Sequence, residues 1–195
     1  VHYFAIPAEN KTAEYGDWLP GPGGKLFKAV QKELGDLPII AEDLGLVTEE
    51  VIALRDKFKF PGMRLLQFAF GGDESNPFFP ENYPENCVVY TGTHDNETTE
   101  GWYKNIPDFV KEHLHRYLQY DGKDKISWEL IKLAWKSKAD LAIVPMQDLL
   151  CLDNSARFNS PGSVGGTNWK WRVRKDDLTP QLENKIRSFS LKYKR

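Results

Sequence analysis

The stretch VVYTGTHDNET, Val88 to Thr98, ends an apolar run with a histidine and an aspartate. Three β-favouring residues lead into a glycine-containing bend, and His94 and Asp95 follow the bend side by side. A short apolar run that ends in turn residues predicts a buried strand. The pair is therefore predicted just past the C-terminal end of a strand, which is where α/β proteins build their sites.

A second stretch has the same form. In PIIAEDLG, Pro38 to Gly45, an apolar run ends directly in Glu42 and Asp43. An acid in such a place is commonly a loop carboxylate or a helix cap, and a histidine beside an aspartate is commonly an ion pair or part of a turn. Two such endings in one fold strengthen the case for a shared site.

Helical and strand-like segments alternate along the chain. Apolar spacing and capping residues predict helices over Gly24–Leu34, Thr48–Phe58, Pro107–Tyr117, from Ser127 onward, and Thr179–Tyr193. Short apolar runs predict strands over Pro38–Ala41, Gly62–Phe70, Val88–Thr91 and Leu141–Met146. This alternation predicts βαβ units with parallel strands, and the two long loops, 73–86 and 153–171, follow strands.

Four strands are too few for a closed (β/α)8 barrel, which typically takes about 250 residues. A doubly wound sheet and part of a barrel both remain open at this point. The first predicted strand is followed by EDLGLVTEE, which lacks the G-x-G-x-x-G pattern of a dinucleotide-binding fold.

The composition is that of a globular protein. The chain has 195 residues, 41% apolar and 28% charged, with a net charge of −2. This charge argues against nucleic acid or an anionic membrane surface as partner, and no apolar run approaches the ~20 residues of a membrane span. Cys87 and Cys151 are predicted to be reduced, partly buried thiols of a cytoplasmic protein. Aromatic residues reach 13%, which fits a large core and also sugar binding.

The spacing of the acids indicates glycoside chemistry. Strands lie ~4.8 Å apart, so Glu42 and Asp95, two strands apart, would have backbones roughly 10 Å apart. Carboxylates converging to about 6–8 Å fit an inverting glycosidase, whereas a retaining enzyme needs a nucleophile only ~5–5.5 Å from its acid. Metal binding is not predicted, because His113 and His115 are two apart and point to different faces of a helix. No G-x-S-x-G motif supports a serine nucleophile.

Six segments together resemble the C-terminal half of the 4-α-glucanotransferases, the amylomaltase or disproportionating-enzyme family of the α-amylase clan. They are IIAEDLG, PGMRLLQFAF, NYPENCVVYTGTHDNETTEGWY, VPMQDLL, ARFNSPG and NWKWR. The resemblance implies an α/β chain, the C-terminal half of a (β/α)8 TIM barrel. Residues 1–195 would form one partial domain with about four parallel strands, flanking helices and long βα loops, the N-terminal half being absent.

The resemblance also implies an activity. It is the retaining transfer of an α-1,4-glucan segment from a donor maltooligosaccharide to an acceptor glucan or glucose, without a metal or an organic cofactor. By position, Glu42 resembles the general acid/base, Asp95 the aspartate that stabilises the transition state, and His94 the residue that hydrogen-bonds the sugar at the cleaved bond. Further residues match positions that line the glucan-binding cleft: Asp43, Asn96, Phe68, Asp73 and Asn159.

One part of the family pattern is missing. The nucleophilic aspartate of the family lies in an R-x-D-H-F-R-G type motif, and the chain contains no such motif. The 195 residues are therefore expected to be inactive alone. Two alternatives stay open: a non-catalytic half-barrel that at most binds glucan and covers its open sheet edges by self-association, or a hydrolase of the same clan.

Overall fold

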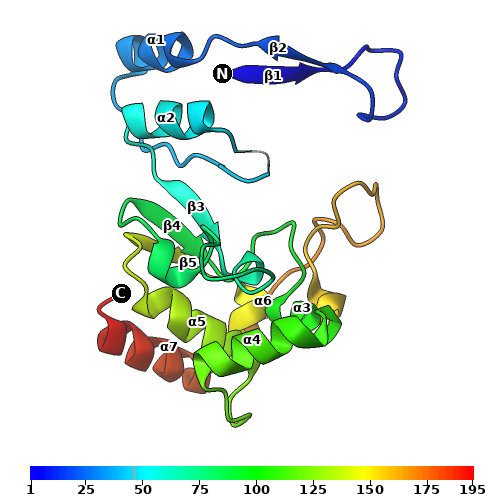
Figure 1. Cartoon of the computed structure of the whole chain (residues 1–195). Coiled ribbons are helices and arrows are strands. Elements are labelled where there is room, and N and C mark those ends of the chain that lie inside the picture. The colour runs from blue at the N-terminus through cyan, green and yellow to red at the C-terminus, as the bar shows by residue number, and fades with distance from the viewer. Residues whose placement is uncertain (46) are drawn as a thin grey trace. The chain divides into compact units, whose positions relative to one another are not determined.

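The computed structural model describes residues 1–45 and 47–195 of the chain. These residues form two compact units, Val1–Met63 and Arg64–Arg195, and each unit is described by itself. Figure 1 shows their helices and strands.

The first unit opens with an antiparallel hairpin that the sequence analysis did not predict. Strand β1 (His2–Ala5) pairs with β2 (Asp17–Pro20), and Phe4 lies opposite Trp18 with ring centroids 5.2 Å apart. Such a cross-strand aromatic pair stabilises a two-stranded ribbon. The long connection between the strands contains no two-residue turn motif that would have indicated the hairpin.

Two helices follow the hairpin, as predicted. Helix α1 spans Gly24–Leu34 and α2 spans Glu49–Lys57. The predicted N-cap of α2 is confirmed, because the Thr48 hydroxyl accepts a hydrogen bond from the Val51 amide at 3.4 Å. Glutamates in the first turn of α2 complement the positive end of the helix dipole.

The strand predicted over Pro38–Ala41 is wrong, because the structure has no strand there. A strand needs a ladder of hydrogen bonds to a neighbour. In the described residues this segment donates one backbone hydrogen bond to another segment, from the Ala41 amide to the Pro61 carbonyl at 2.9 Å. The Ile40 side chain is 41% exposed, so the apolar run is not buried within this unit.

A three-stranded sheet of order β3-β4-β5 organises the second unit (Figure 1). Its strands are β3 (Gly62–Leu65), which crosses the boundary between Met63 and Arg64, β4 (Cys87–Tyr90) and β5 (Leu141–Ile143). Strands β4 and β5 are parallel, with Val88 opposite Leu141, which confirms the parallel pairing expected from the alternation.

Two of these strands are shorter than predicted. The chain turns into a 3₁₀ helix, η1, at Leu66–Phe68, so β3 does not extend to Phe70. Strand β5 ends before Pro145, which has no amide proton to donate and caps helix α6 (Met146–Leu149).

Four longer helices flank the sheet. They are α3 (Thr99–Asn105), α4 (Asp108–Leu118), α5 (Ile126–Lys136) and α7 (Pro180–Tyr193). The shorter 3₁₀ helices are η2 (Pro80–Asn82), η3 (Asn154–Ala156) and η4 (Lys175–Asp177).

The structure confirms one predicted cap of these helices and corrects another. The Thr179 hydroxyl accepts from the Leu182 amide at 3.2 Å, as predicted. The predicted Ser127 cap of α5 is wrong, because Ser127 lies inside the first turn. Its amide and hydroxyl instead donate to Oε1 of Glu100, a residue of α3, at 3.1 and 3.0 Å. A carboxylate from a neighbouring helix therefore replaces the local cap.

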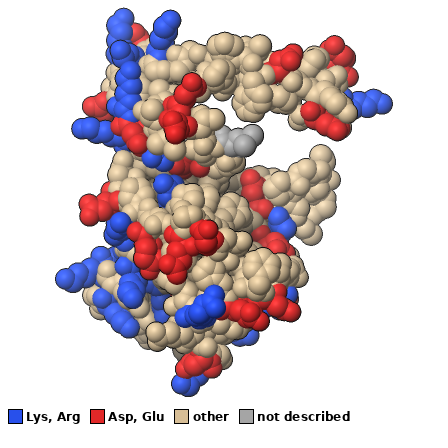
Figure 2. Space-filling view, in the orientation of Figure 1, with Lys and Arg blue, Asp and Glu red and all other residues tan. Residues whose placement is uncertain are grey.

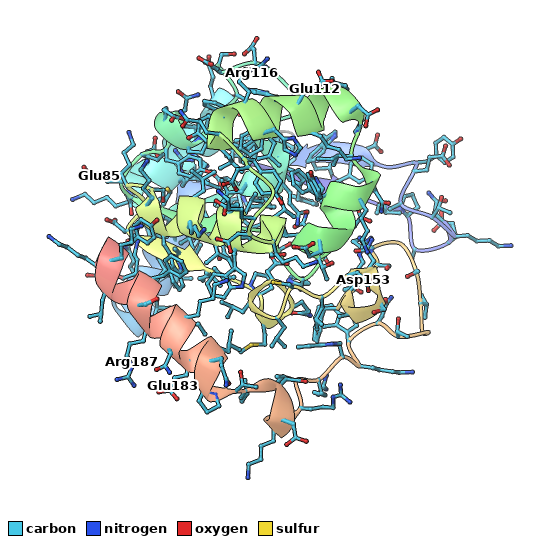
Figure 3. The ribbon with its side chains drawn as sticks, turned by 90° about the horizontal axis from the view of Figure 1, so that it is seen from below. Glu85, Glu112, Arg116, Asp153, Glu183 and Arg187 are labelled. Carbon is cyan, nitrogen blue, oxygen red and sulfur yellow. The ribbon has the colours of Figure 1, made fainter. Side chains whose placement is uncertain are left out.

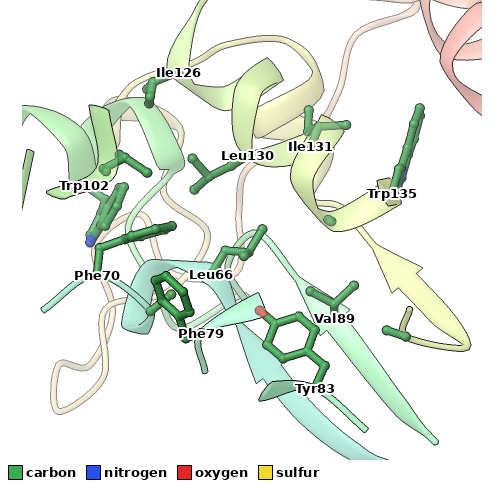
Figure 4. Packing of buried hydrophobic residues seen from close by; sticks show 14 of the residues in the cluster. Leu66, Phe70, Phe79, Tyr83, Val89, Trp102, Ile126, Leu130, Ile131 and Trp135 are labelled. Atoms are coloured by element: carbon green, nitrogen blue, oxygen red, sulfur yellow. The ribbon is translucent and has the colours of Figure 1, made fainter. Parts of the chain in front are cut away.

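The core of the second unit lies between the sheet and the helices (Figure 4). Leu66, Val89, Leu130 and Ile131 are fully buried there. Aromatic side chains fill the same core: Phe70, Phe79, Tyr83, Trp102, Trp128 and Trp135. Much of the high aromatic content is therefore core material. Cys87 is buried and Cys151 half-buried, and no disulfide joins them.

Charged side chains of both signs cover the face shown in Figure 2. In Figure 3, Glu183 and Arg187 lie on the outer side of α7, where they form an i,i+4 ion pair at 2.8 Å. Exposed pairs of this kind contribute only about 0.3–0.5 kcal/mol, so the core rather than the surface stabilises the unit. Over the described residues, no helix is both long and apolar enough to cross a bilayer.

Candidate active site

His94 and Asp95 lie on the turn that leaves β4. Their side chains are 53% and 45% exposed, and His94 Nε2 is 3.4 Å from Asp95 Oδ1. The pair is therefore open to a ligand while each side chain restrains the other.

The side chain of Asn96 holds this turn in shape. Its Oδ1 accepts hydrogen bonds from the Thr93 amide at 2.9 Å and from the Thr93 hydroxyl at 2.7 Å. Gly92 lies nearby, where a Cβ would come within 2.7 Å of Gln67 Nε2, so a larger residue there would need the Gln67 side chain to shift. Asn96 thus has a structural role inside the turn, and its contact with a sugar stays a prediction.

Asn159 comes from a distant loop and binds both residues of the pair. Its side-chain amide donates to Asp95 Oδ1 at 2.6 Å, and its backbone amide donates to the His94 carbonyl at 3.1 Å. In the described part of the chain, Asp95 Oδ2 accepts no hydrogen bond. One carboxylate oxygen is therefore fixed by the protein, and the other can receive a ligand hydroxyl.

Two aromatic side chains, Trp169 and Phe158, pack together next to His94. The Trp169 ring lies 5.2 Å from the His94 ring and 5.1 Å from the Phe158 ring, centroid to centroid. Trp169 adopts a left-handed backbone with φ 63°, and its amide donates to the Phe158 carbonyl at 2.8 Å. The sequence places Trp169 in the long loop 153–171 without predicting a role for it, since only the fold shows which tryptophan lies beside the histidine.

A buried aspartate lies behind the turn. Asp148 on α6 is 1% exposed and accepts hydrogen bonds from Thr91 and Thr99, which flank the turn. Burial raises the pKa of Asp148, although these hydrogen bonds act in the opposite direction. Asp148 lies in the segment VPMQDLL, and no sequence pattern predicts its role.

Phe68 and Asp73 lie on a different segment of the second unit. Phe68 is 44% exposed and packs edge-on against Phe78. Asp73 accepts from the Ser75 hydroxyl and amide at 2.5 and 2.8 Å, which lowers the pKa of Asp73. It lines a hollow of about 770 Å³ with Phe109. Among the described residues, no hydrogen bond, ion pair or ring contact connects Phe68 or Asp73 to the His94–Asp95 pair, so their glucan contacts stay predictions.

Glu42 and Asp43 belong to the first unit. Glu42 is exposed, whereas Asp43 is 8% exposed. Asp43 Oδ2 accepts from Arg55 Nη1 at 2.5 Å, and its Oδ1 accepts from the Met63 amide at 2.6 Å. These contacts give Asp43 a structural role in its unit. The acid/base role of Glu42 and the substrate contact of Asp43 stay predictions.

No group of three or more His, Cys, Asp or Glu side chains in residues 1–45 and 47–195 is arranged to hold a metal ion. The site that the structure does assemble contains His94, Asp95 and Asn159, with Asn96 supporting the turn and Trp169 beside it.

Comparisons with known proteins identify relatives of the whole chain. A family described as glycoside hydrolase 77, 4-alpha-glucanotransferase, matches residues 1–179. A 4-alpha-glucanotransferase of Synechocystis is 50% identical over 94% of the chain, and one of Streptococcus pneumoniae is 46% identical over 99% of it. These matches cover 37% and 38% of the two relatives, so the chain spans well under half of their length.

Solved structures agree with this result. The structure of amylomaltase from Streptococcus agalactiae in complex with acarbose matches the chain with a TM-score of 0.94 and 36% identity. That match covers 100% of this chain and 39% of the other. The amylomaltase from Corynebacterium glutamicum matches with a TM-score of 0.64 at 17% identity, which shows a shared fold.

Proposed function

We propose that this chain, which belongs to the 4-α-glucanotransferase family, carries part of the catalytic centre of a retaining 4-α-glucanotransferase. The reaction transfers an α-1,4-glucan segment from a donor maltooligosaccharide to an acceptor glucan or glucose. Because the chain covers 37–39% of its relatives, the activity is assigned to a protein that also contains the remaining part. The proposed placement is the C-terminal half of a (β/α)8 barrel.

The observation that carries the proposal is the contact between Asn159 and Asp95. The Asn159 side-chain amide donates to one oxygen of this carboxylate at 2.6 Å and so fixes the orientation of the carboxylate. The transition state of glycosyl transfer resembles an oxocarbenium ion and carries developing positive charge. The Asp95 carboxylate, with one oxygen turned to the ligand, would bind this state more tightly than the ground state.

The other residues of the proposed mechanism divide the proton transfers and the sugar contacts. Glu42 would donate its proton to the oxygen of the bond that breaks, and would then accept a proton from the hydroxyl of the incoming sugar. His94, held 3.4 Å from Asp95 Oδ1, would hydrogen-bond the sugar at the cleaved bond. The carboxylate nucleophile that forms the covalent glycosyl intermediate would come from the part of the enzyme outside this chain.

Transfer requires that sugar, not water, reaches the intermediate. The aromatic pair Phe158 and Trp169 stands beside His94, and Trp169 is 53% exposed. An exposed ring next to a polar pair offers an apolar face to a sugar ring and displaces water from it. The similar Streptococcus agalactiae amylomaltase forms a complex with acarbose, which supports saccharide binding by members of this family.

A product assay tests the proposal. Maltotriose is incubated with the 195-residue chain, and in parallel with a chimeric enzyme in which this chain replaces the matching segment of the Streptococcus pneumoniae relative. The chain alone is expected to give no turnover, because it encodes no nucleophile. The chimeric enzyme is expected to produce glucose together with longer maltooligosaccharides.

Each other outcome contradicts a defined part of the proposal. Disproportionation by the chain alone would show that the nucleophile lies within it. Glucose without longer products would identify a hydrolase. A folded chimeric enzyme that binds maltotriose without turning it over would favour a non-catalytic, glucan-binding role for this chain.

A further inference from the structure

The Arg157 guanidinium joins the backbones of two loops at the candidate site. Its Nη2 donates to the Asp95 carbonyl at 2.8 Å, and its Nε donates to the Asn159 carbonyl at 2.9 Å. We propose that Arg157 is a positioning residue, which sets the orientation of the Asp95 carboxylate by holding Asn159 against it. The inference rests on the proposed glucan transfer and assigns a residue outside the set predicted from the sequence.

Three hydrogen bonds join the two loops around Asp95. Arg157 supplies one through Nη2 to the Asp95 carbonyl, and Asn159 supplies the others through its backbone amide to the His94 carbonyl and its side-chain amide to Asp95 Oδ1. A fourth bond, from Arg157 Nε to the Asn159 carbonyl, lies within the second loop and fixes the Asn159 backbone to the guanidinium. The bond that orients the Asp95 carboxylate therefore depends on the position of the Asn159 backbone. Arg157 fixes that backbone to the same turn that carries Asp95.

An arginine suits this task better than a lysine. Its guanidinium is a rigid planar fork, so two N–H groups can reach two acceptors in a fixed geometry. A lysine places all its donors on one nitrogen at the end of a flexible stem. In Arg157 the two donors serve carbonyls that are 64 residues apart in sequence, Asp95 and Asn159. Lysine would keep the positive charge but lose the fork.

Loss of Arg157 would affect the rate through the orientation of the Asp95 carboxylate at the transition state. A charge-stabilising carboxylate must meet the transition state in a fixed geometry, and a misplacement of about 1 Å can cost on the order of 10²-fold in rate. Binding of a maltooligosaccharide in the ground state would depend much less on the orientation of this one carboxylate. Loss of Arg157 is therefore expected to lower kcat while KM changes little.

The first test uses the 195-residue chain and needs no activity. Amide hydrogen exchange is measured in the unsubstituted chain and in Arg157→Ala and Arg157→Lys variants. The Asn159 amide, which donates to the His94 carbonyl, is expected to exchange at least 10-fold faster in Arg157→Ala and at an intermediate rate in Arg157→Lys. Unchanged exchange of this amide in Arg157→Ala would overturn the proposal.

The second test measures kinetics in the chimeric enzyme described above. Arg157→Ala is expected to lower kcat for maltotriose disproportionation by about 10²-fold, with KM within about threefold, and Arg157→Lys is expected to recover part of the rate. Unchanged kcat in Arg157→Ala would contradict the positioning role. A loss of rate that only matches the unfolded fraction of the variant would also contradict it.

Arg195 provides a matched control. Its guanidinium also donates to backbone carbonyls, those of Trp135, Ser137 and Ala139, at 3.0, 2.6 and 2.6 Å, at the end of α5. Arg195→Ala is expected to lower the Tm and leave kcat and KM unchanged, since it caps a helix and contacts no residue of the site. Failure of the unsubstituted chimeric enzyme to form longer products would contradict the proposed function, whereas the exchange result would still decide the role of Arg157.

Discussion

Thr91 and Thr99 donate hydrogen bonds to the same oxygen, Oδ2 of Asp148, at 2.5 and 2.7 Å. Thr91 directly follows β4 and Thr99 is the first residue of α3, so the two ends of the turn that carries His94 and Asp95 meet at one buried carboxylate. The Thr99 amide also donates to Oδ1 at 2.7 Å, which satisfies one of the free amides at the helix start. Asp148 therefore fixes the base of the turn.

The pH dependence of stability should reveal Asp148. Burial raises its folded-state pKa above that of the unfolded chain, so the folded state binds the proton more tightly. The stabilising contribution is then present below the ordinary aspartate pKa and is lost as the pH rises through the raised one. The unfolding free energy of the wild type minus that of Asp148→Asn should fall from pH 3 toward neutral pH. Urea unfolding at each pH measures this difference in unfolding free energy, and Asp140→Asn at an exposed position is the control. A difference that rises with pH would contradict the prediction.

Glu42→Gln tests the acid/base assignment. Glutamine keeps the size of the side chain but cannot donate or accept the catalytic proton, so transfer in the chimeric enzyme should fall about 10³-fold. Binding of maltotriose, measured by calorimetry, should be retained because the substitution is nearly isosteric. Glu49→Gln, in the first turn of α2, is the control and should leave the rate unchanged. A Glu42→Gln enzyme with the wild-type rate would remove Glu42 from this role.

Two substitutions of Asn159 separate the loss of a hydrogen bond from the addition of a charge. Asn159→Ala removes the donor to Asp95 Oδ1 and should lower kcat about 10- to 100-fold. Asn159→Asp places a second carboxylate against the first, and at pH 7 it should be slower than Asn159→Ala because like charges repel. Its rate relative to Asn159→Ala should improve as the pH falls, since a protonated carboxyl can donate again. Asn184→Ala on α7 is the control, and a pH-independent ratio would contradict the prediction.

Gly101→Ala should destabilise the start of α3. A Cβ at position 101 would collide with the side-chain amide of Asn154, which donates to Glu97 Oε1 at 2.5 Å. Overpacking of this kind typically costs about 1–3 kcal/mol, and the Tm of the chain should fall accordingly. The combination with Asn154→Ser removes the colliding group, so the double variant should lose less stability than the sum of the single losses. Strict additivity would show that the collision is relieved elsewhere.

Local signals in the sequence predict much of the secondary structure in both units. The apolar run before His94 does form a parallel strand, and the Thr48 and Thr179 caps rest on short-range hydrogen bonds that a sequence encodes directly. The two wrong predictions, the Pro38–Ala41 strand and the Ser127 cap, concern features that depend on contacts between segments distant in sequence. The Pro38–Ala41 run lacks a ladder within its unit, and the start of α5 uses the carboxylate of Glu100 instead of a local cap.

In the candidate site, too, the sequence predicts the features that depend on local pattern but not those that depend on contacts between distant segments. The position of His94 and Asp95 after a strand predicts their exposure on a turn, and the resemblance to the glucanotransferases adds Asn159. Arg157 escapes both approaches, because its role is to bind the backbone carbonyl of a residue 62 positions away. Any residue type offers a carbonyl, so no sequence pattern marks such a contact. The pairing of Trp169 with His94 is equally a property of the folded loop.

Because Asp148 binds both ends of the turn, the segment between Thr91 and Thr99 can be exchanged as a unit. Its two ends are fixed at one point, and the entropy of closing a loop grows only slowly with length. Segments of different length could therefore be grafted between Thr91 and Thr99 while β4 and α3 keep their places. Variation in what this fold recognises can then be introduced at the turn without rebuilding the core beneath it.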